Sequence, residues 1–166
     1  MLQVLLFCAL ATSGPTTGPT TVPFDSPESP VYWLRLAVKE VEGGARVDPI
    51  LTGDCAVALA EASDRVWFDR AEKALLRCVQ EVPRSAARAH ESLAKSYATL
   101  GELEQAEKHL AKAKEAASQL PEEFRHRRLK YLPYVRVQCY ARGGRPAQAI
   151  AAAGETLARG IPDGPD

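Results

Sequence analysis

The side chains in this sequence that could bind a metal ion or transfer a proton include three histidines, His90, His109 and His126. None lies three or four residues from another histidine or from a cysteine, the spacing that places two ligands on one face of a helix. A lone carboxylate beside a lone histidine, such as Glu91 next to His90, is common on charged helices. We therefore expect packing or surface histidines, with no metal site and no general acid or base.

The four cysteines, Cys8, Cys55, Cys78 and Cys139, form no CxxC pair. The sequence therefore contains neither a zinc ribbon nor a thioredoxin-like redox motif, and core packing is the expected role of the thiols. One alternative stays open. Cys55 and Cys78 fall on two predicted antiparallel helices at levels that could face each other, so they could form a disulfide if the protein is exported.

Motifs that hold phosphate groups do not occur in the sequence. Because there is no GxxxxGK[ST] or GxGxxG pattern, we expect no nucleotide and no other cofactor. The 21 basic and 21 acidic residues balance, so the chain lacks the long-range attraction to phosphate backbones that nucleic-acid-binding proteins use. For the basic run at residues 125–130 we favour a solvated helix face over contact with an acidic peptide or lipid headgroups. An enzyme is not expected.

The N-terminal residues 1–11, MLQVLLFCALA, are apolar and end in a small-x-small pattern, as an export signal does before its cleavage site. No Lys or Arg precedes the apolar part, so a misassigned start or a buried or lipid-touching helix are alternatives. Export would make the protein secreted or periplasmic, and otherwise we expect it in the cytoplasm. The segment is too short to span a bilayer, and no transmembrane helix is predicted. Residues 12–30 are rich in Pro, Thr, Ser and Gly, which predicts a disordered linker.

The rest of the chain is predicted to be all-α, because Ala, Leu, Glu, Arg and Lys dominate after residue 50 and aromatic residues make up only 7%. Gly and Pro positions divide it into short amphipathic segments. An N-terminal helix and loop are expected at 31–48, with the helix at 31–42. Further helices are expected near residues 49–63, 68–82, 86–100, 102–119, 122–142 and 146–159, followed by a tail at 161–166.

A pattern of the form Tyr-x3-Gly-x4-Ala begins at Tyr97 and again at Tyr140, an offset of 43 residues. A repeated helix pair of this length is typical of stacked arrays, since one pair cannot bury its apolar face alone. We therefore expect the helices of residues 49–160 to pack as a succession of antiparallel pairs.

The unit that begins at Ala87 resembles the tetratricopeptide repeat (TPR) family. It carries small or apolar residues at eight of the positions typical of that family: Leu93, Ala94, Tyr97, Gly101, Leu103, Ala106, Leu110 and Ala113. The neighbouring units match less well, and Pro133 interrupts the first helix of the last one. The resemblance implies a short TPR-like α-solenoid over residues 49–160.

The same resemblance implies a concave groove, lined by the first helix of each unit, that binds a peptide or helix of another protein. We therefore expect a non-catalytic interaction scaffold. The family's carboxylate clamp needs Lys and Asn at two positions where this chain has Glu91 and Lys95, so that partner is not expected. The implied groove residues are Arg88, Glu91, Lys95, Ala98 and Thr99 of the middle unit, and Tyr131, Tyr134, Gln138 and Arg142 of the next.

An alternative function is self-assembly through the last helix, at residues 146–159. Small apolar residues surround this helix, and no polar capping helix follows it, as solenoids usually require. The protein would then be a structural module that forms a homo-oligomer. The residues that suggest it are Ala147, Ala151, Ala152 and Ala158.

Overall fold

The computed structural model describes residues 23–43 and 49–158, except for the side chains of Pro49 and Cys78. The predicted apolar segment 1–11, most of the linker, the loop at 44–48 and the tail after 158 lie outside the described residues. The described part is all-α, as predicted, and every helix begins and ends within three residues of its predicted bounds. The helices are α2 (Pro30–Glu42), α3 (Pro49–Glu61), α4 (Arg65–Glu81), α5 (Ala86–Thr99), α6 (Leu103–Ser118), α7 (Glu122–Arg142) and α8 (Pro146–Ala158), with a 3-10 turn η1 (Pro83–Ser85) before α5.

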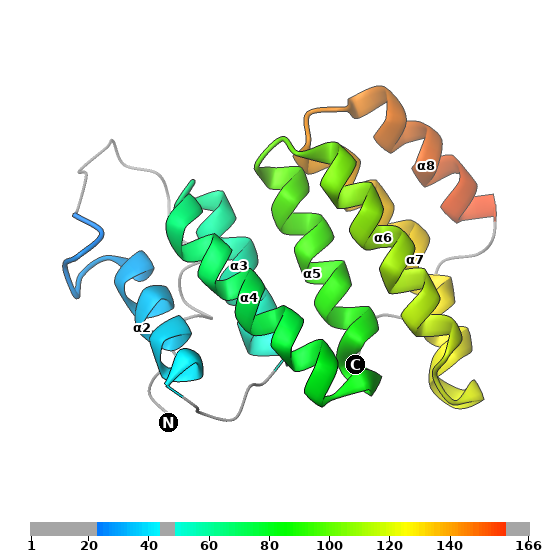
Figure 1. Ribbon diagram of the computed structural model, residues 1–166. Helices are drawn as coiled ribbons and strands as arrows, with labels where there is room; N and C mark the ends of the chain where they lie inside the picture. The colour runs from blue at the N-terminus through cyan, green and yellow to red at the C-terminus, as the bar shows by residue number, and fades with distance from the viewer. Residues whose placement is uncertain (1–22, 44–48, 159–166) are drawn as a thin grey trace.

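Helices α3 to α8 pack as successive antiparallel neighbours (Figure 1). Helix α5 contacts both α3 and α7, so these three helices form one row. Helix α4 packs on α3 and α5, α6 packs on α5 and α7, and α8 packs on α7. Helix α2 packs on α3 and α4 at the opposite end. Helices α4 and α6 thus each cover a junction between two helices of the α3–α5–α7 row, and α2 and α8 each cover one end of it.

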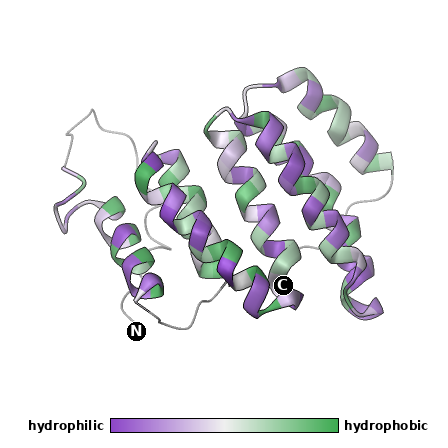
Figure 2. Ribbon diagram, viewed as in Figure 1, coloured by the Kyte–Doolittle hydropathy of each residue, from purple (hydrophilic) through white to green (hydrophobic). Residues whose placement is uncertain are grey.

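The core between these helices consists mainly of alanine with a few large side chains. Phe68, Leu59, Leu75 and Leu93 are among the largest side chains that are fully buried. Gly53 of α3 faces Ser92 of α5 with no room for a Cβ atom, so these two helices approach closely. Figure 2 shows hydrophilic residues along the outward turns of α4 and α6 and hydrophobic residues where helices meet. Small residues therefore set the close helix spacing.

The turn that follows the first helix of each pair has the same hydrogen bonds three times. The carbonyls of Leu59, Tyr97 and Tyr140 each accept a hydrogen bond from the backbone N–H five residues later, at 2.9, 2.8 and 2.9 Å. This 6→1 bond defines a Schellman motif, which needs a left-handed residue after the helix. Gly101 and Gly144 fill that position with φ of 80° and 67°. The repeated Tyr-x3-Gly pattern is therefore the sequence of a helix-ending turn.

Ser63 occupies the corresponding position after α3, with φ of 56°. The sequence predicts a break at Ser63-Asp64, but the Tyr-x3-Gly pattern does not include this turn, because serine stands where the other two turns have glycine. A non-glycine residue in the left-handed region costs about 1 kcal/mol or more. The side chain of Ser63 is exposed and makes no hydrogen bond among the described residues, so replacing it with hydrogen removes no hydrogen bond found there.

We therefore expect Ser63→Gly to raise the free energy of unfolding by about 1 kcal/mol, because glycine adopts this backbone conformation without strain. Urea denaturation followed by circular dichroism measures the change. The reciprocal variant Gly101→Ser should lower stability by a similar amount, since a Cβ at Gly101 meets only open space and the backbone conformation is the sole difference. A lower midpoint for Ser63→Gly would contradict this account.

The end of the predicted linker is not an extended tether. Residues 23–29 form turns, with backbone hydrogen bonds from Ser26 to Pro23 and from Ser29 to Ser26. Arg35 of α2 pairs with Asp25 at 2.8 Å and also with the buried Asp64 at 2.7 Å. These contacts attach the segment to α2 and attach α2 to the corner between α3 and α4, despite a composition that favours open chain.

Candidate functional site

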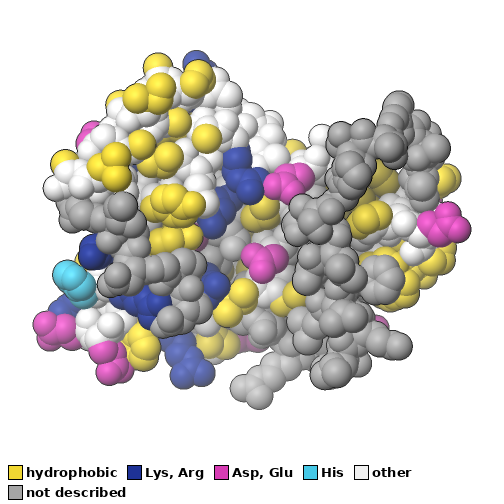
Figure 3. Space-filling model, turned by 180° about the vertical axis from the view of Figure 1, so that it is seen from behind, with side chains coloured by type: hydrophobic (Ala, Val, Ile, Leu, Met, Phe, Trp, Pro, Cys, Tyr) yellow, Lys and Arg dark blue, Asp and Glu magenta, His cyan; other side chains and the backbone are white. Residues whose placement is uncertain are grey.

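The residues predicted to line a groove lie along the row of α3, α5 and α7. At the C-terminal ends of these helices, Arg142 of α7 donates a hydrogen bond to Thr99 Oγ1 of α5 at 3.3 Å. The same guanidinium pairs with the carboxylate of Glu61 on α3. One predicted residue therefore links all three helices. Seen from behind, basic and acidic side chains lie side by side along the middle of the molecule (Figure 3).

Glu91 lies on α5, the middle helix of this row, and is only 3% exposed. Its Oε2 is 3.4 Å from Nη1 of Arg128 on α7, and its Oε1 has no hydrogen-bond partner. Burial raises the pKa of the Glu91 carboxyl, and the charges of Arg128, Lys95 and Arg88 oppose this effect. Glu91 therefore joins α5 to α7 and does not present its carboxylate to a ligand.

Arg128 belongs to the basic run that was expected to be a solvated helix face. The structure corrects this expectation at this position, because the Arg128 side chain is partly buried and turned toward α5. The sequence contains no signal that distinguishes Arg128 from its basic neighbours. Its role follows from the contact between α5 and α7.

Arg88 and Lys95 are the two cations that α5 contributes to this face. No ion pair to Arg88 or Lys95 is found among residues 23–43 and 49–158. Burial lowers the pKa of the Lys95 ammonium, while the charges of Glu91 and Asp54 act in the opposite direction. Positive charge at these two positions is therefore available to an anionic group.

Helix α7 contributes aromatic and amide side chains to the face. The rings of Tyr131 and Tyr134 lie 5.5 Å apart, and Tyr134 is 42% exposed. The Oε1 atom of Gln138 is buried and has no hydrogen-bond partner. Ala98, in contrast, is fully buried in the core, so its prediction as a groove residue is wrong. We call the remaining set the α5–α7 face: Arg88, Lys95, Thr99, Tyr131, Tyr134, Gln138 and Arg142.

His90 and His109 are packing histidines, one of the two expected roles, but they contact each other, which was not predicted. His90 Nδ1 of α5 and His109 Nδ1 of α6 are 3.1 Å apart, and both side chains are buried. The Tyr97 ring stacks on His109 with centroids 5.4 Å apart. The two residues lie on either side of the turn at Gly101, on antiparallel helices that pack together, and this packing brings them into contact. Their separation of 19 residues along the chain does not by itself predict the contact.

Burial keeps this histidine pair neutral. It lowers the pKa of His109 to about 4 and also lowers the pKa of His90, and the nearby charge of Lys112 adds to both effects. One imidazole donates a hydrogen bond from its Nδ1–H to Nδ1 of the other across the 3.1 Å contact. Within the part of the chain that the structure describes, no three His, Cys, Asp or Glu side chains could hold a metal ion together.

The thiols that the structure describes are buried. Burial raises the pKa of the Cys139 thiol to about 12, so this group is a poor nucleophile. Cys55 is also buried. The side chain of Cys78 lies outside the described residues, and the alternative of a Cys55–Cys78 disulfide stays a prediction.

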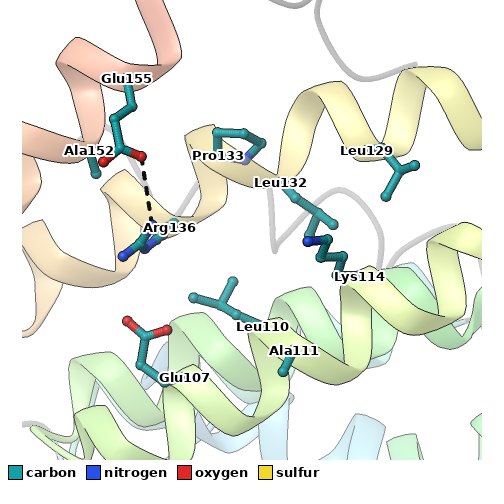
Figure 4. Close-up of a pocket in the computed structure, with 10 residues that line it drawn as sticks. All are labelled: Glu107, Leu110, Ala111, Lys114, Leu129, Leu132, Pro133, Arg136, Ala152 and Glu155. Carbon is teal, nitrogen blue, oxygen red and sulfur yellow. Dashed lines mark ion pairs between the residues drawn. The ribbon is translucent and has the colours of Figure 1, made fainter. Parts of the chain in front are cut away.

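A pocket lies between α6 and α8, with α7 as its floor (Figure 4). Its volume is about 540 Å³. Tyr140 donates a hydrogen bond to Glu107 at 2.5 Å and accepts two from Arg136, which lies 3.8 Å from Glu155. This network joins the three helices across the mouth. The lining residues are Glu107, Leu110, Ala111, Lys114, Leu129, Leu132, Pro133, Arg136, Ala152 and Glu155.

The chain was compared with protein-family models, curated proteins and solved structures. None of them matches. No helix among the described residues combines the length and the apolar character that crossing a membrane requires. The geometry of the α5–α7 face is therefore the basis for assigning a function.

Proposed function

We propose that this protein is a non-catalytic interaction scaffold, a short TPR-like solenoid that binds a peptide or helix of another protein on its α5–α7 face. One observation carries the proposal: side chains chosen for a groove from two separate repeats lie beside one another on adjacent helices, linked through Arg142, Thr99 and Glu61. The order in which α3 to α8 pack, and the turn that recurs three times, support the repeat architecture.

The side chains of the face favour a partner with acidic and apolar residues close together. Tyr131 and Tyr134 offer aromatic area, which contributes most to binding at such surfaces. Arg88 and Lys95 form no ion pair among the described residues, so a partner carboxylate would gain a charge-assisted contact without breaking an existing pair. Arg142 and Arg128 are already paired and contribute rigidity.

The groups with the most reactive chemistry do not lie on this face. The histidine pair and Cys139 are buried. Burial lowers the pKa values of the histidines and raises the pKa of the Cys139 thiol, and both changes favour the neutral forms. The proposed role needs only recognition, and the surface offers aromatic area and charge for that purpose.

Selection of a random peptide library on the purified chain tests this proposal without a known partner. We expect selected peptides to contain acidic residues beside apolar ones, and to lose about tenfold in affinity for Arg88→Glu and for Tyr134→Ala, which corresponds to about 1.4 kcal/mol each. Isothermal titration calorimetry measures the affinity, and circular dichroism checks that each variant is folded.

Lys73 provides a matched control, because it is an exposed cation on α4, away from the α5–α7 face. Lys73→Glu makes the same charge reversal as Arg88→Glu and should leave the affinity of the selected peptides within about twofold of wild type. Glu91 is unsuitable for this experiment, because its substitution changes the packing of α5 on α7. Peptides that bind all variants equally would exclude the α5–α7 face as their site.

A further inference from the structure

Helix α8 is apolar on two sides. Ala152 and Thr156 are buried on the side that packs on α7. Another side faces outward, where Ile150 is 73% and Leu157 64% exposed. Figure 3 shows hydrophobic side chains gathered over this end of the molecule, which is opposite α2. Two large aliphatic side chains seven residues apart on one exposed stripe form a face that nothing in the described chain covers.

Gly154 lies on the same outward stripe, between Ile150 and Leu157. A Cβ at this position would meet nothing within 4 Å, so no contact within the described chain requires a glycine there. Glycine inside a helix is less stable than alanine by about 0.5 to 1 kcal/mol. The lower helix stability that Gly154 causes has an explanation if another helix approaches α8 closely at this position, because only glycine leaves room for it.

The outward stripe is complementary to itself in the antiparallel direction. Ile150 and Leu157 occupy one position of a seven-residue repeat, and Ala147 and Gly154 occupy the other. In a two-fold antiparallel helix pair, the heptad position that holds Ile150 and Leu157 in one copy faces the position that holds Ala147 and Gly154 in the other copy. Ile150 then lies over Gly154 of the second copy, and Leu157 lies over Ala147 of the second copy.

The charges of α8 do not oppose this pairing. Glu155 is the only ionisable residue of the helix, and Arg136 of the same chain lies 3.8 Å from it. In the register described, Glu155 faces Ala149 of the second copy and not another carboxylate. Every large side chain is thus matched with a small one, and no like charges meet.

We propose that α8 is a self-association surface on which a second copy of this chain docks in the antiparallel direction, with Ile150 over Gly154 of the second copy. This inference does not depend on the α5–α7 face. A 13-residue helix is about 20 Å long, and such a pair buries less than the roughly 800 Å² per partner of a stable interface. The dimer is therefore weak and forms at high protein concentration.

Sedimentation velocity over a concentration series from micromolar to near-millimolar tests the proposal. We expect the wild-type chain to shift from monomer to dimer, and Ile150→Glu to weaken association at least tenfold. Val66 of α4 is an isolated aliphatic residue of similar exposure, 69%, so Val66→Glu is the matched control and should associate like wild type. A wild-type chain that stays monomeric throughout, or equal association of Ile150→Glu and wild type, would overturn the proposal.

Substitutions at Gly154 separate an interface role from a purely structural one. Gly154→Ala should raise the melting temperature of the monomer, because alanine favours the helix, and at the same time weaken the dimer. The exchange variant Ile150→Gly/Gly154→Ile keeps the composition and restores a large residue opposite a small one, so it should recover association that Gly154→Ile alone loses. If the exchange variant remains monomeric, the antiparallel register is wrong. Peptide binding by the α5–α7 face is measured separately and should be unchanged in the monomeric variants.

Discussion

Acidification should remove on the order of 3 kcal/mol of folding stability through the buried histidine pair. The pKa of His109 falls from 6.5 to about 4 on folding, a gap of roughly 2.5 pH units at about 1.4 kcal/mol each. Because the folded pKa is depressed, the unfolded chain binds more protons between these two values, and stability falls as the pH falls. The stabilisation is complete above pH 6.5 and is lost as the pH approaches 4. The lowered pKa of His90 acts in the same direction.

Urea denaturation across this pH range measures the effect, and two variants assign it. His90→Leu/His109→Phe replaces both imidazoles with apolar groups, leaves no buried donor or acceptor unpaired, and keeps a ring against Tyr97. This variant should show a flatter dependence of stability on pH. His126 is exposed, so His126→Gln should keep the wild-type slope. An unchanged slope in the double variant would assign the acid sensitivity to carboxylates instead.

The helix boundaries could be predicted from the sequence because they depend on local chemistry. Gly and Pro positions end helices through backbone conformation, and the turn at Gly101 confirms this for one of the predicted breaks. The break at Ser63-Asp64 was also predicted, but its left-handed backbone was not, because serine rarely adopts that conformation. The hydrogen bonds of the Schellman motif and the packing of α3 on α4 impose it there.

Side-chain partners on different helices were harder to predict. The choice of Arg88 and Lys95 as groove residues of α5 rests on the resemblance to the TPR family. The pairing of Glu91 with Arg128 depends on how α7 is rotated against α5, and a charge run looks solvated until that rotation is known. The contact between His90 and His109 likewise depends on how α6 packs on α5, although a predicted antiparallel hairpin already places the two helices side by side.

Substitution of Arg128 should destabilise the protein by about 2 to 3 kcal/mol, because it leaves the Glu91 carboxylate buried without a close cation. Breaking a fully buried pair typically costs about 3 to 5 kcal/mol. The expected loss is smaller here, because Arg128 is partly exposed and the 3.4 Å separation from Glu91 is long. Arg128→Met retains most of the side-chain volume, so the change in free energy of unfolding, measured by urea denaturation, reports mainly on the lost charge.

The double variant Glu91→Gln/Arg128→Met separates this charge effect from a packing effect. With no buried carboxylate to neutralise, it should recover most of the lost stability, and a double-mutant cycle gives the coupling energy between the two residues. The difference in pH dependence between Arg128→Met and wild type should have the opposite sign to the effect of the histidines, which both proteins retain. Burial raises the pKa of Glu91, so its folded form takes up a proton more readily than the unfolded chain, and acidification should partly relieve the defect. If the double variant is as unstable as Arg128→Met, then Arg128 stabilises the α5–α7 contact through packing and not through its charge.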